Sequence, residues 1–294
     1  MRKITIHPER QQYAPGETVN GYAEVVSDKA FTFNAMHVTL ECKEHTRVTV
    51  GSGDTQTTYR EKHIHYHEVY ELMQPGEFTY GESRFEFSFA LPEELPSTYS
   101  GANGWITLIL EAKIEVSWAI DPKDKKELEI FASRDQVQPE PVRRSDLDDG
   151  IAVLEVDIPN NTVYAGDHLQ FRYRVDREVT MRGVRLELYR SERATARGHK
   201  RTQRIRISSD FIDDASIMRD SWNSATVFVP FSMPTTYRGP LIKLTTTLKV
   251  VIDIPWRRDR DLKIKILTSH CTKQAREDLR KDPFSDYDFG SSNR

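Results

Sequence analysis

The sequence predicts an all-β protein built from two β-sandwich domains in tandem, followed by a polar tail. Three observations predict this fold: long stretches in which apolar and polar residues alternate, prolines that interrupt them, and a second occurrence of the same arrangement later in the chain. Successive side chains of a strand point to opposite faces, so an alternation with a period of two indicates strands with one buried face.

The first alternating stretch covers residues 84–118. Phe85, Phe87 and Phe89 alternate with polar residues, and a run with two Leu-Pro pairs then interrupts the pattern. Proline has no N–H to donate to a sheet, so a strand is expected to end there. After two glycines, every second residue from Ile106 to Trp118 is apolar. We expect these two segments to form a hairpin on the wall of a sandwich.

The same order of motifs occurs again in the second half of the chain. The matching pairs are residues 89–92 (FALP) with 231–234 (FSMP), 98–101 (TYSG) with 236–239 (TYRG), and 13–17 (YAPGE) with 164–167 (YAGD). The chain is therefore predicted to hold two copies of one β-domain, each of ordinary domain size. We place the first domain at residues 1–140, a proline-rich and charged linker at 141–150, the second domain at 151–267 and the tail at 268–294.

Composition narrows the classes of function. The net charge of −3 argues against a globally basic nucleic-acid binder and leaves room for a local basic patch. The first residues lack the apolar core of a signal peptide, and no apolar run approaches the length of a membrane span. We therefore expect a soluble cytoplasmic protein that binds no nucleic acid and does not cross a membrane.

Cysteine usage points to a reducing compartment. The chain has two cysteines, Cys42 and Cys271, too few for a disulfide framework. Cys42 follows Met36, Val38 and Leu40 on the apolar face of an alternating segment. We predict that Cys42 is a buried free thiol.

These motifs resemble the arrestin superfamily and, within it, the α-arrestins (arrestin-domain-containing proteins). The residues that carry the resemblance are the turn from Tyr13 through Pro15, Gly16 and Glu17 to Gly21, the run from Phe85 to Pro96 with the glycine-led strand after it, and the echo of both in the second half. The resemblance covers residues 1–267 and leaves the tail uncovered. It implies two immunoglobulin-like sandwiches joined by a short hinge, and a scaffold or cargo adaptor that is not an enzyme. Retromer's arrestin-like subunit and a bacterial sporulation-control family share this fold, so the fold alone does not identify the function.

Two features of the sequence are compared with that family, one that departs from it and one that matches it in position. Many α-arrestins recruit HECT ubiquitin ligases through Pro-Pro-x-Tyr motifs, and this chain contains none, so adaptor function by that route is not expected. The polar stretch 51–62 lies where receptor-binding arrestins carry their finger loop. The resemblance assigns a finger-loop-like role to Gly51, Gly53, Thr55 and Tyr59, with a mobile hairpin tip as the alternative.

A basic strip in the second domain is the sharpest local signal. Its members are Arg185, Arg190, Arg193, Arg197, Lys200, Arg201, Arg204 and Arg206. The alternation with Val184, Ile205 and Ile207 predicts that Arg185, Arg204 and Arg206 face solvent. Guanidinium groups on one wet face suit bidentate contacts with phosphate groups, and the strip resembles the region where several arrestins bind inositol phosphates or phosphoinositides. The alternative is an ordinary solvated charged face.

The sequence has few features that are typical of a catalytic or metal-binding site. His63, His65 and His67 alternate along one strand, and two histidines at this spacing can share a zinc ion, but no third ligand is evident. We expect them to line the solvent face opposite Ile64 and Tyr66. The chain has no nucleophile elbow, phosphate-binding glycine loop or His-Glu-x-x-His motif. We therefore predict no enzymatic activity, no catalytic residue, no metal and no cofactor; a metal-dependent hydrolase using the histidine run is the alternative from another class.

The tail carries a candidate docking motif. Asp282, Pro283 and Phe284 match a tripeptide used by clathrin-adaptor ligands in eukaryotes, and Tyr287 and Phe289 add apolar anchors to an otherwise polar segment. Tripeptides often occur by chance, so a plain solvated tail is the alternative.

The sequence as a whole therefore predicts a non-enzymatic, arrestin-like adaptor. Its expected partners are a protein, either a membrane-protein cargo or a component of trafficking, endocytosis or signalling machinery, and an inositol phosphate or anionic membrane surface. A peripheral position at a membrane is left open. The alternative among binding proteins is a prokaryotic regulator of the sporulation-control type.

Overall fold

A computed structural model describes residues 2–117, 120–132 and 140–270. The regular structure of this part of the chain is almost all strand, with only two 3-10 helices of one turn each. It divides into two compact units. Unit 1 comprises Met1–Ala132, Ala194–Arg201 and Pro240–Ile242, and unit 2 comprises Ser133–Arg193, Thr202–Gly239 and Lys243–Arg294. Among the described residues, no helix has the length and apolar character needed to cross a membrane.

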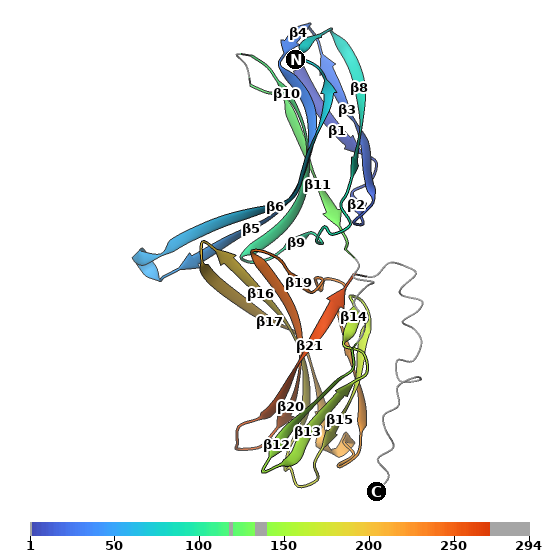
Figure 1. The fold of residues 1–294 in the computed structure, drawn as a ribbon. Helices are drawn as coiled ribbons and strands as arrows, with labels where there is room; N and C mark the ends of the chain where they lie inside the picture. Colours follow the sequence, from blue (N-terminus) through green and yellow to red (C-terminus); the bar gives the residue numbers. More distant parts are fainter. Residues whose placement is uncertain (1, 118–119, 133–139, 271–294) are drawn as a thin grey trace. The chain divides into compact units, whose positions relative to one another are not determined.

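Unit 1 is a sandwich of two sheets (Figure 1). A three-stranded sheet has the order β1–β3–β8, and a six-stranded sheet has the order β2–β11–β10–β5–β6, with β9 also paired to β10; β4 and β7 pair separately. The bounds are β1 Arg2–Pro8, β2 Gln12–Tyr13, β3 Thr18–Ser27, β4 Phe31–Phe33, β5 Ala35–Val50, η1 Gly53–Thr55, β6 Thr57–Met73, β7 Gly76–Phe78, β8 Gly81–Ala90, β9 Tyr99–Ser100, β10 Gly104–Glu115 and β11 Lys123–Ile130.

The core of unit 1 follows the predicted alternation. Along β10 the even-numbered residues from Ile106 to Ile114 are buried, and the odd-numbered residues between them are only half-buried. Leu108 lies directly opposite Cys42 of β5, and Cys42 is a fully buried free thiol, as predicted. Burial of these apolar faces between the sheets is the main favourable contribution to folding.

The predicted hairpin within residues 84–118 is wrong. The alternating strands exist, but β8 belongs to the three-stranded sheet and β10 to the six-stranded sheet. The Leu-Pro run between them carries the chain from one layer to the other, with Leu91 and Leu95 buried. Alternation reveals one buried face per strand and does not distinguish a partner in the same sheet from one in the facing sheet.

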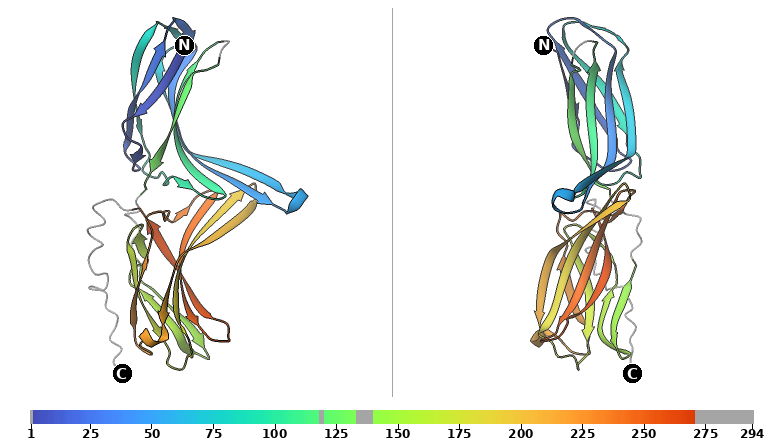
Figure 2. Two further views of the ribbon diagram at one scale, coloured as in Figure 1. Left: turned by 180° about the vertical axis from the view of Figure 1, so that it is seen from behind. Right: turned by 90° about the vertical axis from the view of Figure 1, so that its left-hand side faces the viewer.

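Unit 2 repeats this architecture (Figure 2). A four-stranded sheet has the order β12–β13–β15–β18, and a six-stranded sheet has the order β14–β21–β20–β16–β17, with β19 paired to β20. The bounds are β12 Val142–Asp148, β13 Ile151–Ile158, β14 Thr162–Tyr164, β15 His168–Val175, β16 Gly183–Ala196, β17 His199–Asp213, η2 Asp214–Ser216, β18 Asn223–Phe228, β19 Tyr237–Arg238, β20 Ile242–Asp253 and β21 Arg260–Ser269. Its core is one continuous cluster that includes Leu154, Phe171, Leu186 and Val250.

The internal repeat inferred from the sequence is visible in the topology. In unit 1 the short strand β2 runs parallel to β11, and in unit 2 the short strand β14 runs parallel to β21. The repeated Thr-Tyr-x-Gly segments form the equivalent short strands β9 and β19, each paired with the long strand that follows it. The protein is thus an all-β chain of two tandem sandwiches.

The predicted linker and the predicted tail boundary need correction. Residues 142–148 form the edge strand β12, which pairs with β13 along its whole length. Charged residues are common on edge strands because they discourage further pairing, and this composition made the segment resemble a linker. At the other end, β21 continues to Ser269, beyond the predicted start of the tail at residue 268.

Candidate functional site

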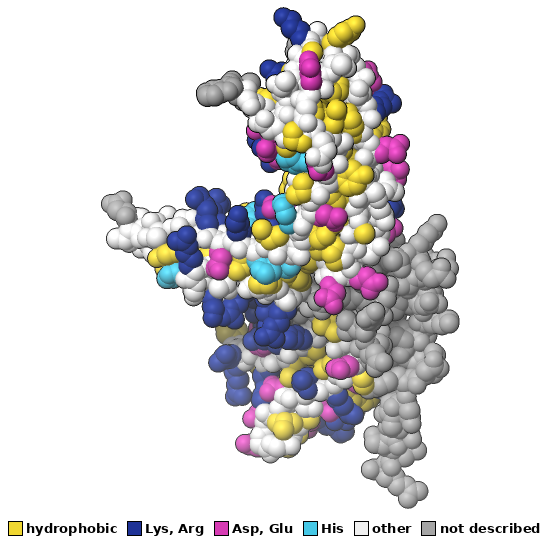
Figure 3. All heavy atoms as spheres, turned by 45° about the horizontal axis from the view of Figure 1, so that its top comes forward, with side chains coloured by type: hydrophobic (Ala, Val, Ile, Leu, Met, Phe, Trp, Pro, Cys, Tyr) yellow, Lys and Arg dark blue, Asp and Glu magenta, His cyan; other side chains and the backbone are white. Residues whose placement is uncertain are grey.

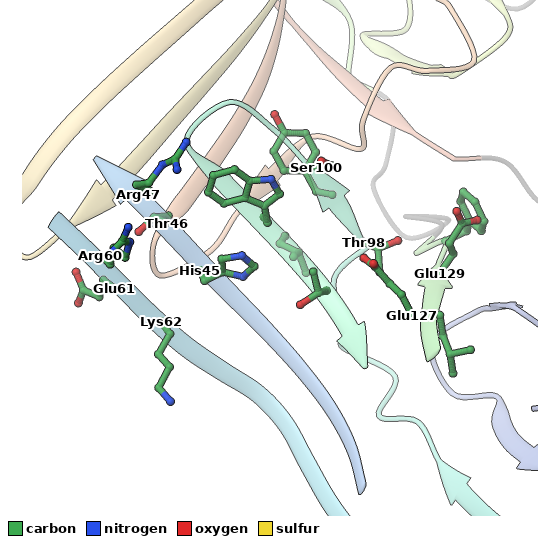
Figure 4. Close-up of a pocket in the computed structure, with 16 residues that line it drawn as sticks. His45, Thr46, Arg47, Arg60, Glu61, Lys62, Thr98, Ser100, Glu127 and Glu129 are labelled. Carbon is green, nitrogen blue, oxygen red and sulfur yellow. The ribbon is translucent and has the colours of Figure 1, made fainter. Parts of the chain in front are cut away.

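Unit 1 contains a groove of about 1090 Å³. Four strands of the six-stranded sheet contribute its lining: β5, β6, β10 and β11, with the segment around β9 closing one end (Figure 4). The strands present their outer faces here, opposite the side chains that enter the core. The groove is therefore built on a rigid sheet rather than on loops.

An aromatic stack forms the floor of the groove. Trp105 of β10 lies directly opposite His45 of β5, and the two rings stack with centroids 5.3 Å apart and an interplanar angle of 17°. The guanidinium of Arg47 lies 5.8 Å from the centroid of the Trp105 ring. Burial lowers the pKa of His45, the nearby Lys43 lowers it further, and Glu127 opposes both. The imidazole is therefore neutral at pH 7 and stacks without an uncompensated charge.

The two sides of the groove carry opposite charges. Arg47, Arg60 and Lys62 come from β5 and β6, where Glu61 also lines the groove, and Glu127 and Glu129 come from β11 on the other side (Figure 4). Lys and Arg side chains also gather on the exposed face of the β5–β6 hairpin in the space-filling view (Figure 3).

The three cations of this wall outnumber its one carboxylate, Glu61, which accepts a hydrogen bond from the backbone N–H of Arg197. Arg47 and Arg60 are direct cross-strand neighbours, and like charges in this position repel each other. Within residues 2–117, 120–132 and 140–270, neither arginine nor Lys62 has a carboxylate within ion-pair distance. An anionic group placed in the groove would relieve that repulsion.

Two polar atoms on the floor have unused hydrogen-bonding capacity. The Nδ1 atom of His45 and the Oγ1 atom of Thr107 are buried and have no hydrogen-bond partner among the described residues. Most buried polar atoms in proteins are hydrogen-bonded, so such atoms call for a water or a ligand. Both lie in strands that also supply the aromatic stack, and both atoms are covered by neighbouring groups beneath the surface of the groove.

The segment before β9 holds the end of the groove in place. The backbone N–H of Thr98 donates to the carbonyl of Ile130 at 3.0 Å, and the N–H of Ile130 donates to Oγ1 of Thr98 at 3.2 Å. Ser100 then pairs with Trp105. This is the repeated Thr-Tyr-x-Gly motif, whose role in unit 1 is to join β10 and β11 at the groove.

Sequence reasoning missed the groove residues. The available signal was Trp105, a large aromatic side chain on the polar face of an alternating strand, beside Thr107 and opposite His45. Its significance depends on the cross-strand register, which brings Arg47, Arg60 and the β11 carboxylates around it. That register is not readable from one strand alone.

The finger-loop-like residues lie at the end of the β5–β6 hairpin. Gly51 and Gly53 adopt positive φ angles of 94° and 56° around the 3-10 turn Gly53–Thr55. Tyr59 lies farther along, within β6, where its ring stacks on His199 with centroids 3.9 Å apart. Tyr59 also packs against the small buried cluster of Val48, Ala194 and Ala196, so it is a packing residue and not part of the tip.

The basic strip is divided between the two units. Arg197, Lys200 and Arg201 belong to unit 1, and Arg185, Arg190, Arg193, Arg204 and Arg206 belong to unit 2. Arg190 is half-buried, whereas Arg193, Arg197, Lys200, Arg201 and Arg204 are exposed. The guanidinium of Arg204 lies 3.9 Å from the ring centroid of Tyr189.

Arg185 does not face solvent as expected. Its guanidinium bonds Asp253 and Asp259, each at 2.6 Å, and its side chain is only 27% exposed. Arg206 lies 3.5 Å from Glu187, which is buried and also accepts a hydrogen bond from the Tyr189 hydroxyl at 2.9 Å. Carboxylates from neighbouring strands thus compensate these two arginines, which the spacing along one strand could not show.

The histidine run is broken by a β-bulge. The register between β5 and β6 shifts at Cys42/Lys43, and His65 is the extra residue. Its Nε2 atom lies 3.0 Å from the buried carboxylate of Glu44, while Ile64 is exposed. The three histidines therefore do not line one face as expected. In the described part of the chain, no group of three or more His, Cys, Asp or Glu residues is arranged to hold a metal ion.

The predicted docking residues of the tail, Asp282, Pro283, Phe284, Tyr287 and Phe289, lie outside the described residues, as does Cys271.

Comparison with known proteins finds one family model that matches part of the chain. Residues 3–136 match the model of the arrestin (or S-antigen) N-terminal domain. No curated protein matches the chain. The family match includes almost all of the sandwich that carries the groove, so this sandwich is similar to the N-terminal domain of arrestins.

Proposed function

We propose that this chain, whose residues 3–136 match the arrestin N-terminal domain, is a non-enzymatic adaptor that holds an extended segment of a protein partner in the groove of unit 1. The observation that carries the proposal is the groove itself: an aromatic floor between a cationic and an anionic wall, with two unsatisfied polar atoms. Within the superfamily, the motifs favour an adaptor of the α-arrestin type, working in the cytoplasm on membrane-protein cargo or on trafficking or signalling components.

The chemistry of the groove defines the segment it would accept. An acidic side chain fits beside Arg47 and Arg60, where it would form charge-assisted hydrogen bonds. An apolar or aromatic side chain fits over Trp105, and a basic side chain fits beside Glu127 and Glu129.

Selection of peptides from a random displayed library on the purified protein tests this proposal. We expect selected peptides to combine an acidic residue with an aromatic or aliphatic one. Trp105→Ala should weaken their binding about tenfold or more, because an aromatic anchor in a groove contributes about 2 kcal/mol or more. The double charge reversal of Arg47 and Arg60 should weaken it as strongly and reduce its dependence on salt.

Charge reversal of Lys3, an exposed residue of β1 in the other sheet, is the matched control and should leave peptide binding unchanged. Peptides that bind all three variants equally well would place the binding site elsewhere and contradict the proposal.

We also propose a second ligand, a phosphate-bearing lipid or inositol phosphate, for the exposed members of the basic strip. The support is the exposure of Arg197, Lys200 and Arg201, all in unit 1, in a segment rich in cations. Arg185 and Arg206 contribute less because carboxylates already compensate them. Co-sedimentation with anionic vesicles at low and high salt is the measurement that tests it.

A further inference from the structure

The four-stranded sheet of unit 2 ends at β18, an edge strand with one open side. β18 pairs with β15, and among the described residues no other strand pairs with it. The backbone N–H of Val229 donates to the carbonyl of Asp167 at 2.9 Å, so the backbone groups of Val229 point toward the β15 side. These groups alternate in direction along an antiparallel strand. The N–H and C=O groups of Ser224, Thr226 and Phe228 therefore point away from the sheet.

β18 lacks the usual protection of an edge strand. Its sequence, Asn-Ser-Ala-Thr-Val-Phe, contains no charged residue and no proline. Natural edge strands carry charges, proline or bulges, because open backbone groups otherwise pair with another chain. The opposite edge of the same sheet is protected in this way: β12 carries two arginines and two aspartates, and its register shifts between Asp146 and Leu147. One edge of the sheet is thus protected against pairing, and the other is suited to it.

One end of the open edge is aromatic. Phe228 is 43% exposed and Phe231 is 64% exposed, and their ring centroids are 6.5 Å apart. The ring centroid of His168, directly opposite Phe228 on β15, is 5.2 Å from that of Phe228. Exposed aromatic rings that gather in one place are typical of a surface that contacts another molecule.

The other end of the edge is cationic. Three guanidinium groups lie within 6.0 Å of the ring centroid of Trp222, those of Arg143, Arg172 and Arg174. Glu155 and Asp157 are the carboxylates that pair with them, so three cations meet two anions. Arg172 lies directly opposite Ser224, whose small side chain leaves room for a large one from another strand. Since aromatic rings attract guanidinium groups, this end is suited to a further aromatic ring.

The edge is complementary to a second copy of itself. Two β18 strands related by a two-fold axis run antiparallel, so the aromatic end of each copy meets the cationic end of the other. If Thr226 pairs with Thr226 of the second copy, Phe228 lies opposite Ser224 of that copy and beside its Arg172. The large ring then covers the small serine and approaches a guanidinium, and two threonines form a favourable cross-strand pair.

We propose that the chain forms a two-fold dimer in which β18 pairs with β18 of a second copy, with Thr226 on the axis. Ser224, Thr226 and Phe228 then each exchange two backbone hydrogen bonds with the other copy, as directly opposed residues of such a pair do. Pro230 has no N–H to donate, so the pairing ends before it. A two-fold contact uses the open edge of both copies, so the assembly stops at two.

The dimer is expected to be weak. One short strand pair buries less than the roughly 1,200 Å² of the smallest stable interfaces, so we expect a dissociation constant of about 10–100 µM. β18 belongs to unit 2, whereas the groove of the proposed function belongs to unit 1. The proposal therefore does not rest on the proposed function, and either can fail without the other.

Sedimentation velocity of the full chain tests the proposal. The wild type should change from monomer to dimer between about 1 and 500 µM, because dimerisation follows mass action. Thr226→Lys and Thr226→Glu each place two like charges directly opposite each other at the axis, so each should weaken the dimer about tenfold or more. Thr226 is exposed in the monomer, so both variants should fold. An equimolar mixture of the two should form a mixed dimer at least as strong as that of the wild type, because opposite charges then meet at the axis.

Thr180→Lys is the matched control, since it makes the same exchange at an exposed threonine between β15 and β16 and should dimerise like the wild type. A wild type that stays monomeric over the whole concentration range overturns the proposal. A dimer that persists in Thr226→Lys also overturns it, because such a dimer uses another surface. A mixture of Thr226→Lys and Thr226→Glu that stays monomeric overturns it as well, because Thr226 then does not face its counterpart.

Discussion

Single residues in this protein owe their properties to cross-strand neighbours. Glu44 is fully buried, and its Oε1 atom accepts hydrogen bonds from the backbone N–H groups of Leu241 and Ile242. Its Oε2 atom lies 3.0 Å from Nε2 of His65. A carboxylate removed from water is tolerated only when donors surround it in this way. The bulge at His65 turns that imidazole toward Glu44 and so gives the buried carboxylate a hydrogen-bonding partner.

Cys42 allows a test of burial at the same scale. Burial, together with the nearby carboxylates of Glu44 and Glu41, raises its pKa to about 12. Above the ordinary thiol pKa of about 8.5 the unfolded chain loses this proton while the native protein keeps it. The unfolded state then binds fewer protons, so the free energy of unfolding falls as pH rises. This contribution is complete below about pH 8.5 and is lost toward pH 12.

We therefore expect Cys42→Ala and Cys42→Ser to lose less stability than the wild type between pH 9 and 10.5. The difference in slope should approach 1.4 kcal/mol per pH unit. Urea unfolding at a series of pH values measures it. Parallel pH profiles for wild type and both variants would mean that the thiol titrates alike in the folded and unfolded states.

An element could be predicted from the sequence where its own residues alternate clearly. β10 was identified from alternation alone, whereas the repeated motifs were recognised as repeats without being predicted to form the short strands β2, β14, β9 and β19. β12 was missed because its charges suit an edge strand as well as a linker. The groove was missed because its walls come from strands far apart in sequence, and a bulge shifts the register of β6. Periodicity gives the faces of a strand but not its neighbours.

The two copies of one turn offer an internal comparison at the scale of the element. Gly16 and Gly166 occupy equivalent turns and have φ angles of 81° and 95°. A β-carbon at Gly16 would meet only Glu93 Cγ at 3.4 Å, whereas one at Gly166 would lie 2.2 Å from the Phe231 ring. Gly16→Ala therefore adds backbone strain, and Gly166→Ala adds the same strain and displaces an aromatic ring.

We expect Gly16→Ala to cost about 1–2 kcal/mol, the usual penalty of a left-handed backbone for a residue with a β-carbon. Gly166→Ala should cost at least about 1 kcal/mol more, as overpacking usually does. Thermal and urea unfolding of the two variants checks the order. Equal losses would show that Phe231 moves aside freely.

At the scale of the whole molecule, the units are not simple halves of the sequence. Unit 1 includes Ala194–Arg201 and Pro240–Ile242 besides its first 132 residues. These segments supply the N–H donors for Glu44 and the small side chains that cover Val48. The sequence repeat alone suggested independent domains divided at one point. The contacts instead make the N-terminal sandwich depend on residues from the second repeat.

This dependence gives a prediction that compares the full chain with a fragment of residues 1–132. In the full chain, Glu44→Gln should cost about 2–4 kcal/mol, because it weakens two buried charge-assisted hydrogen bonds and the pairing with His65. In the fragment the two N–H donors are absent and water reaches the carboxylate, so the same substitution should cost less than about 1 kcal/mol.

Glu41→Gln on the same strand is the control, since Glu41 is partly exposed beside Lys43 and should cost little in either background. Urea unfolding followed by circular dichroism measures all four differences. A loss for Glu44→Gln that is as large in the fragment as in the full chain would mean that Glu44 is held by its own sheet and not by the segment 240–242.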